Sequence, residues 1–154
     1  MWWVAILLFF ILVIAWKTIK VVQQSEVYIV ERLGKYHGTL GAGPQFIVPF
    51  LDRIRAKVDL REQIMDVPPQ SVITKDNVTI RIDTVVFYQI TDARKAIYEI
   101  QNLRVAVQNL TTTTMRDVVG KMDLDSTFSS REQINIQLRQ ILDEGTDKWG
   151  CKVN

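Results

Sequence analysis

The chain has 154 residues, of which 47% are hydrophobic and 23% are charged, and its formal net charge is +2. Lys17 and Lys20 account for this excess, because no acidic residue precedes position 22 and the remaining chain carries 17 basic and 17 acidic side chains. A body without net charge does not attract a polyanion, so we expect no nucleic-acid partner. The single cysteine, Cys151, excludes an intrachain disulfide and a cysteine-based zinc site.

The first 16 residues carry no charged side chain, and the apolar run resumes at Val21 and Val22. The Val, Ile, Leu and Phe residues between positions 4 and 14 favour membrane insertion by roughly 3 to 6 kcal/mol in total. Lys17 and Lys20 can extend their ammonium groups to the lipid headgroups while their stems stay in lipid. We therefore expect residues 1–22 to form one transmembrane helix, with a monotopic hairpin or an interfacial helix as the alternatives. A cleaved signal peptide is disfavoured, because a positive n-region and a small-residue cleavage site are missing.

Tryptophans at both ends of this run are typical of the aromatic belts at membrane interfaces. Because the lysines follow the apolar run, the positive-inside rule predicts a cytoplasmic domain and an external amino terminus. The predicted anchor residues are Trp2, Trp3, Phe9, Phe10, Trp16, Lys17 and Lys20.

The soluble part begins with strand-like patterns. Apolar residues partly alternate with polar ones at 26–33, and short strands are predicted at 54–59 and 62–67. Glycines and prolines in residues 34–49 predict a long loop, and Pro68-Pro69 marks a strand end or a sheet edge. Asp76-Asn77 separates strand-like runs at 70–74 and 78–90 and predicts a hairpin turn.

Beyond residue 91 the apolar period changes from two to 3.6 residues, which predicts helices. Asp92 is expected to cap a short helix, a longer helix is expected over about 103–119, and a capping box at Ser129 and Glu132 is expected to start another. The fold class is therefore α+β. The domains are a membrane anchor at 1–22 and one domain at 24–154, mainly strands over 24–90 and mainly helical over 91–154.

An apolar island lies within the predicted loop and offers a second candidate membrane contact, dipping into the bilayer surface beside the anchor. The alternative is that these side chains plug the core. The residues are Phe46, Ile47, Val48, Phe50 and Leu51.

A run of mixed charges follows the apolar island. Such runs are usually solvated surface, but alternating signs also complement a neighbouring copy and suggest subunit contacts. The candidate contact residues are Arg53, Arg55, Asp59, Arg61, Glu62 and Asp66.

No motif in the chain points to catalysis, and no cofactor or metal is expected. His37 lies in a glycine-rich segment without a recognisable orienting partner. Thr111–Thr114 is more consistent with hydroxyls that bond back to the preceding helical turn than with a nucleophile, and Cys151 is expected to be a buried, inert thiol.

Several segments, read in order, resemble the stomatin-like branch of the SPFH, or Band 7, family over about residues 24–154. The matching segments are Gly43–Phe50, Val58–Arg61, Asp66–Gln70, Thr74–Val78, Thr113–Arg116, Val118–Gly120, Ser130–Glu132 and Trp149–Gly150. The resemblance implies a β-rich subdomain close to the membrane and a second one with helices packed on a sheet.

The resemblance also implies a non-enzymatic membrane scaffold that forms homo-oligomers at the lipid bilayer and organises lipids or membrane proteins. The alternatives are an adaptor or regulator of a membrane protease or channel, or a partner of a small OB-barrel membrane protein. A membrane-associated hydrolase is disfavoured. The family continues beyond the Trp-Gly motif into a closing strand and then a long helix that drives much of the ring assembly, whereas this sequence stops at Asn154.

Overall fold

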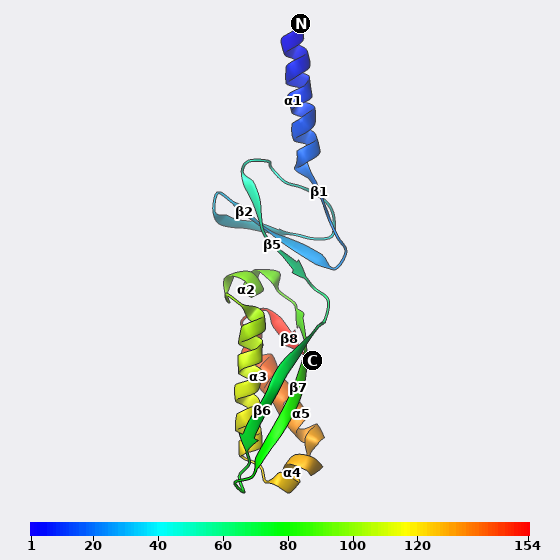
Figure 1. Cartoon of the computed structure of the whole chain (residues 1–154). Helices are drawn as coiled ribbons and strands as arrows, with labels where there is room; N and C mark the ends of the chain where they lie inside the picture. The colour runs from blue at the N-terminus through cyan, green and yellow to red at the C-terminus, as the bar shows by residue number, and fades with distance from the viewer. The chain divides into compact units, whose positions relative to one another are not determined.

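The computed structural model describes residues 1–154, which divide into a first unit, Met1–Leu60, and a second unit, Arg61–Asn154 (Figure 1). The elements of the first unit are α1 (Trp2–Thr18), β1 (Ile19–Val22), β2 (Glu26–Arg32), β3 (Lys35–Leu40), β4 (Gly43–Phe46) and β5 (Asp52–Asp59). Those of the second are β6 (Gln63–Ile73), β7 (Thr79–Ile90), α2 (Ala93–Tyr98), α3 (Leu103–Gly120), α4 (Leu124–Ser129), α5 (Arg131–Asp147) and β8 (Cys151–Val153). The predicted α+β class is confirmed.

The predicted transmembrane helix over residues 1–22 is wrong. The helix ends at Thr18 because Ile19–Val22 form strand β1, which pairs antiparallel with β4. Its 17 residues rise about 25 Å, whereas the hydrocarbon core of a bilayer is about 30 Å thick. No helix in the structure is both long enough and apolar enough to cross a membrane. The single-pass topology and the orientation derived from it therefore have no support in the structure.

The first unit contains two small antiparallel sheets. One pairs β1 with β4, and the other has the strand order β3-β2-β5. Ile29 and Val30 of β2 and Val58 of β5 are buried, as are Val22 and Ile47. These few apolar side chains form the interior of the unit.

The long loop predicted over residues 34–49 is wrong as well, since it contains β3 and β4. Its glycines lie at strand ends and irregular positions. Gly43, with φ +106°, opens β4 opposite Val22, and the register between β2 and β3 shifts at Val30 and Glu31. Glycine and proline therefore mark the boundaries of short strands here.

The second unit is a three-stranded antiparallel sheet, ordered β6-β7-β8, with helices α3 and α5 packed against it (Figure 1). The hairpin turn predicted at Asp76-Asn77 is confirmed, and Asn77 takes the left-handed conformation at φ +63°. Pro68-Pro69 does not end a strand, because β6 continues through it with a register shift between Val67 and Gln70. The alternative prediction of an edge is correct, since β6 pairs only with β7.

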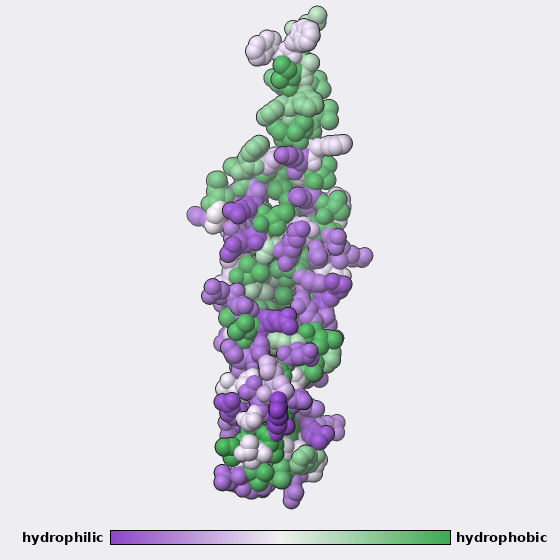
Figure 2. All heavy atoms as spheres, viewed as in Figure 1, coloured by the Kyte–Doolittle hydropathy of each residue, from purple (hydrophilic) through white to green (hydrophobic).

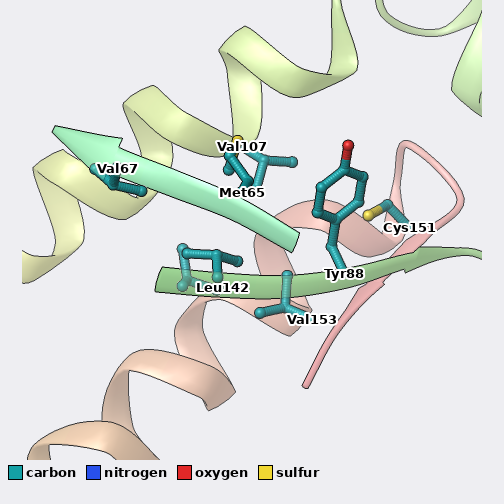
Figure 3. Close-up of a cluster of buried hydrophobic side chains, with 8 residues drawn as sticks. Met65, Val67, Tyr88, Val107, Leu142, Cys151 and Val153 are labelled. Atoms are coloured by element: carbon teal, nitrogen blue, oxygen red, sulfur yellow. The ribbon is translucent and has the colours of Figure 1, made fainter. Parts of the chain in front are cut away.

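Helices and strands of the second unit share two buried apolar clusters. The first joins the sheet to α3 and α5 through Met65, Val67, Val86, Tyr88, Val107, Leu142, Cys151 and Val153 (Figure 3). The second surrounds Met115 and Val119 of α3 and includes Val72, Val118, Ile134 and Leu138. Along β7, Ile80, Ile82, Val86 and Tyr88 alternate onto the face that packs into these clusters.

The helix starts agree with the sequence only in part. Asp92 caps α2 by accepting a hydrogen bond from the backbone of Lys95, as predicted. The predicted capping box at Ser129 and Glu132 is absent, because Ser129 closes the short helix α4 and α5 starts after Ser130 without a side-chain cap.

Gly150 lies just before β8 and forms hydrogen bonds with the turn between β7 and α2. Its carbonyl accepts hydrogen bonds from the backbone of Thr91 and Asp92 at 2.8 and 3.0 Å, and its φ is +65°. A Cβ atom at this position would lie 2.5 Å from the carbonyl oxygen of Asp92. Both the conformation and the space therefore require glycine.

We expect Gly150→Ala to lower the free energy of unfolding of the second unit by about 2–4 kcal/mol, combining left-handed strain with overpacking. The measurement is urea unfolding followed by Trp149 fluorescence, with the other tryptophans replaced by phenylalanine. Gly120→Ala is the matched control, because its Cβ would meet only the carbonyl oxygen of Ile73 at an ordinary 3.6 Å. Equal stability of the two variants would contradict this assignment.

Candidate functional site

Helix α1 has no buried residue, and its apolar side chains are exposed on every side. Figure 2 shows hydrophobic atoms over the visible face of the helix, which begins with Trp2 and Trp3. Singly exposed apolar residues are common on proteins, but a contiguous apolar surface marks a site of interaction. The helix is therefore the first part of a candidate interaction surface.

The apolar surface continues from α1 onto the β1–β4 pair. Ile19 and Val21 alternate onto one face of β1, and Phe46 lies directly opposite Ile19. The three side chains are 50%, 69% and 77% exposed. The backbone N–H of Ile47 donates to the carbonyl of Thr18 at 2.8 Å, so the end of β4 is joined to the last residue of the helix.

The five residues predicted for the membrane-surface loop divide into two groups. Phe46, Val48, Phe50 and Leu51 are exposed, whereas Ile47 is buried and belongs to the interior. The two interpretations of the apolar island therefore apply to different residues. Ile47 plugs the core and its neighbours face outward.

Two chain reversals meet beside this loop and form what we call the apolar tip, consisting of Leu33, Phe50 and Leu51. The backbone N–H of Leu33 donates to the carbonyl of Leu51 at 3.4 Å. Leu33 and Phe50 both adopt left-handed conformations, at φ +51° and +76°, which costs about 1–2 kcal/mol for residues with a side chain. Both side chains are largely exposed. Leu33 is not among the residues predicted from the sequence, where the adjoining Gly34 is the only signal of a turn.

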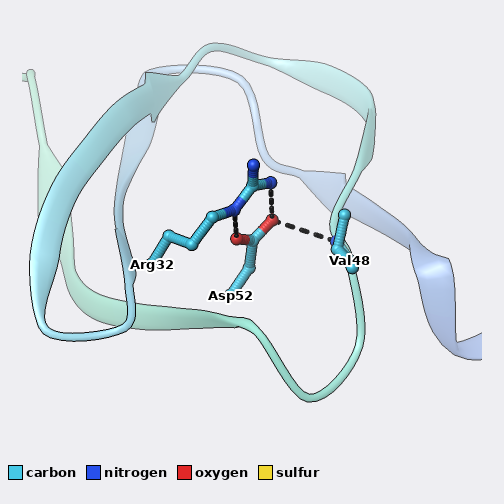
Figure 4. Close-up of polar contacts among 3 residues, drawn as sticks. All are labelled: Arg32, Val48 and Asp52. Carbon is cyan, nitrogen blue, oxygen red and sulfur yellow. Dashed lines mark hydrogen bonds and ion pairs between the residues drawn. The ribbon is translucent and has the colours of Figure 1, made fainter.

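A bidentate ion pair holds the base of the apolar tip (Figure 4). The guanidinium of Arg32 donates from Nε and Nη2 to the two carboxylate oxygens of Asp52 at 2.6 and 3.0 Å. The same carboxylate accepts from the backbone N–H of Val48 at 3.0 Å. Asp52 thus ties the end of β2 to the loop before β5, and its side chain is only 4% exposed.

These hydrogen bonds stabilise the charged form of Asp52. Donation from Arg32 is the main cause and donation from Val48 a further one, and together they lower the pKa of Asp52 from 3.8 to about 2. Asp52 in turn raises the pKa of Arg32. The pair therefore stays ionised at any pH above about 4.

The charged residues predicted as subunit contacts divide between the two units. Arg53, Arg55 and Asp59 lie on β5 of the first unit, whereas Glu62 lies in the second. Arg55 approaches Glu31 of its own chain at 3.7 Å, and Glu62 accepts a hydrogen bond from Asn154 at 2.7 Å. Exposed pairs of this kind contribute little stability. Contacts between copies through these residues, which also include Arg61 and Asp66, remain a prediction.

The residues considered for chemistry lie on three different elements. His37 is exposed on β3, and Thr111 donates its hydroxyl to the carbonyl of Val107 one turn earlier, as predicted. Cys151 is buried in the core of the second unit, as predicted, where burial raises its pKa to about 11. A thiol with this pKa is protonated at neutral pH and is a weak nucleophile.

We expect Asp52→Asn to change the acid response of the first unit. Because the folded pKa lies below the unfolded one, the ion pair stabilises the wild type above pH 4, and this contribution is lost as the pH falls through about 2. The variant has no carboxylate to protonate at this position, so the stability of its first unit should not fall for this reason between pH 4 and pH 2. The measurement is an NMR titration of the Ile29 and Val30 methyl groups.

The matched control is Asp117→Asn, which breaks the exposed pair with Lys121 in the second unit and should leave the same signals unchanged. Superimposable pH profiles for the wild type and Asp52→Asn would rule out this role for the ion pair.

Comparison of the sequence with known proteins identifies the family of this chain. Residues 20–154 match the SPFH domain / Band 7 family. The chain is 50% identical over 149 residues to an uncharacterized protein of Mycobacterium tuberculosis, covering 97% of this chain and 39% of the relative. It is 47% identical over 148 residues to an uncharacterized protein of Methanothermobacter thermautotrophicus, with coverages of 96% and 46%.

A stomatin homolog of Pyrococcus horikoshii is 42% identical over 149 residues, covering 97% of this chain and 56% of the homolog. The chain thus spans between two fifths and three fifths of the length of these relatives. The match covers the three sheets apart from Ile19, the apolar tip and the helices of the second unit. The chain belongs to the SPFH domain / Band 7 family.

Proposed function

We propose that this protein is a non-enzymatic scaffold that attaches to a lipid bilayer through the apolar surface of its first unit and organises lipids or membrane proteins there by self-association. Membership in the SPFH family suggests a membrane-associated scaffold, and stomatin homologs are among the similar proteins. The observation that carries the proposal is the exposure of α1, which has no buried residue.

Exposed apolar surface of this extent is unfavourable in water, because each Å² costs about 25 cal/mol. A bilayer removes that cost for a helix that is apolar on all sides, since such a helix has no polar face to keep in water. We propose that α1 partitions into the apolar region of the lipid. Trp16 and Lys17, at its carboxyl end, are suited to the headgroup region, where an aromatic ring and a charged tip are both accommodated.

The β1–β4 pair and the apolar tip would then add a second contact at the bilayer surface. Phe46 adjoins the end of α1 through the Ile47–Thr18 hydrogen bond, and Phe50 is 90% exposed at a strained position. Strained, exposed apolar residues are typical of sites where function outweighs local stability. The Arg32–Asp52 pair would keep this contact in a fixed conformation.

Tryptophan fluorescence tests the lipid attachment. In phospholipid vesicles, a Trp149→Phe variant, which keeps Trp2, Trp3 and Trp16, should be strongly quenched by lipids brominated on their acyl chains. A variant in which only Trp149 remains is the matched control, and it should be quenched little. Equal quenching of the two variants would contradict a lipid-embedded α1.

Phe50→Trp, in a background where the native tryptophans are phenylalanine, tests the apolar tip. We expect its emission to shift to shorter wavelength on addition of vesicles and to be quenched by shallow brominated lipids. Phe128→Trp is the matched control, since Phe128 is a 57% exposed phenylalanine of the second unit. The spectrum of Phe50→Trp could stay unchanged while the tryptophans of α1 are quenched in the Trp149→Phe variant. In that case the helix alone would attach the protein, and the apolar tip would not contact the bilayer.

A measurement of self-association distinguishes the scaffold function from the adaptor function. Electron microscopy and mass photometry of the protein in membranes should show assemblies of several copies without another protein. A complex of fixed stoichiometry with one membrane protease, channel or OB-barrel protein, and no assembly of the protein alone, would favour the adaptor.

A further inference from the structure

Charge is unevenly distributed along the three-stranded sheet of the first unit. At the end next to the apolar tip, residues 31–35 and 52–55 contain four basic and two acidic side chains. At the opposite end, residues 26–28 and 57–59, which pair with each other, contain one basic and two acidic side chains. Surfaces that face only water usually carry both signs interspersed. In this sheet the basic excess is confined to the end that carries the exposed apolar side chains.

Both acidic side chains at the tip end already have a basic partner. Asp52 holds Arg32 in the bidentate pair, and Glu31 has Arg55 at 3.7 Å. The net positive charge of this end therefore comes from the two remaining cations, and both are exposed. They are Lys35 and Arg53.

The strand register places cations on both sides of the apolar tip. Lys35 is the register partner of Arg32, so these two side chains lie on one face of the sheet, with Leu33 in the turn between them. Arg53 directly follows Asp52 on β5, so its side chain lies on the other face. We call the three cations around the tip the basic collar, consisting of Arg32, Lys35 and Arg53.

Arg32 keeps hydrogen-bonding capacity beyond its pair with Asp52. The pair uses Nε and Nη2, and Figure 4 shows the third nitrogen, Nη1, directed away from the carboxylate. The Arg32 side chain is 36% exposed, so part of its planar fork is accessible. Such a fork matches the geometry of phosphate oxygens. Because Asp52 already fixes its orientation, little conformational freedom is lost when Nη1 donates to a phosphate.

The surroundings of the basic collar favour a phosphate that belongs to a lipid. Leu33 and Phe50 are 79% and 90% exposed beside it. At a bilayer surface, the burial of apolar side chains and the attraction of Lys or Arg to anionic headgroups both contribute to binding. A free phosphate ion would contact the cations alone and leave both apolar side chains in water.

We propose that the basic collar selects anionic phospholipids, binding the headgroup phosphate between Arg32 and Lys35 on one face of the sheet and attracting a further headgroup through Arg53 on the other. This inference rests on the proposed attachment of the apolar tip to the bilayer and adds which lipid gathers around it. An assembly of several copies would concentrate anionic lipid at its tips, which is a specific way to organise lipids.

Quenching by bromines on one lipid class measures this selection. The full chain with Phe50→Trp, in the background without native tryptophans, is bound to vesicles of equal parts phosphatidylcholine and phosphatidylglycerol. Shallow bromines are carried by phosphatidylglycerol in one preparation and by phosphatidylcholine in the other, so the surface charge is identical. Each Lys or Arg near an anionic surface adds about a fivefold preference. We expect brominated phosphatidylglycerol to quench at least about twofold more strongly.

Lys35→Gln combined with Arg53→Gln removes the two cations that supply the net charge and keeps the Arg32–Asp52 pair. The ratio of the two quenching strengths should then fall to about one. Lys75→Gln combined with Lys152→Gln is the matched control. It removes the same number of charges from exposed positions of the second unit and should keep the ratio of the unaltered collar.

A ratio near one for the unaltered collar would overturn the proposal, as would a ratio that the collar variant leaves unchanged or a tip tryptophan that neither lipid quenches. The tryptophans of α1, measured in the Trp149→Phe variant with vesicles of phosphatidylcholine alone, report membrane attachment separately. If they are quenched while the tip shows no lipid preference, the proposed function stands and the lipid selection fails. If they are not quenched, the attachment itself fails.

Two further measurements distinguish other ligands of the basic collar. We expect the preference to persist in excess inorganic phosphate at constant ionic strength, and its loss would assign the collar to free phosphate and overturn the proposal. We also expect the collar variant to assemble as the unaltered protein does. Loss of self-association with an unchanged lipid preference would assign Arg53 to contacts between copies instead.

Discussion

The pairing of β1 with β4 is the constraint on which the first unit depends. It takes Ile19–Val22 into a sheet, so the helix ends at Thr18 although the apolar run resumes at Val21 and Val22. It also joins the start of the following loop to the end of α1 through the Ile47–Thr18 hydrogen bond. The exposed helix and the outward side chains of the β1–β4 pair thereby form one continuous apolar surface.

The first unit keeps this surface in a defined conformation with a small interior. Only a few side chains, among them Ile29, Val30 and Ile47, are fully removed from water. The bidentate Arg32–Asp52 pair adds a directional constraint where packing is thin, because a charged fork fixes both distance and angle. Two left-handed, non-glycine residues persist at the tip because the strands around them determine the path of the chain.

The second unit has a different organisation. Its sheet buries one face under α3 and α5, and its buried polar groups are internally bonded, as with Thr111 on the carbonyl of Val107. Cys151 is deep in this packing with a raised pKa, which leaves the only thiol of the chain structural.

Local patterns were enough to predict the α+β class, the Asp76-Asn77 turn, the Asp92 cap and the long helix α3, because each depends on residues close together in the chain. They also located the apolar runs at residues 1–16 and 46–51 but did not decide which side chains of the second run are exposed. The end of α1, strands β3 and β4, and the division of the apolar island into buried Ile47 and exposed Phe50 depended on pairing between distant segments. Val21 and Val22 suit a lipid-facing helix and a strand equally well, and the partner strand Gly43–Phe46 decided between them. Leu33 joined the apolar tip for the same reason, since its neighbour Leu51 reaches it only once β2 and β5 lie side by side.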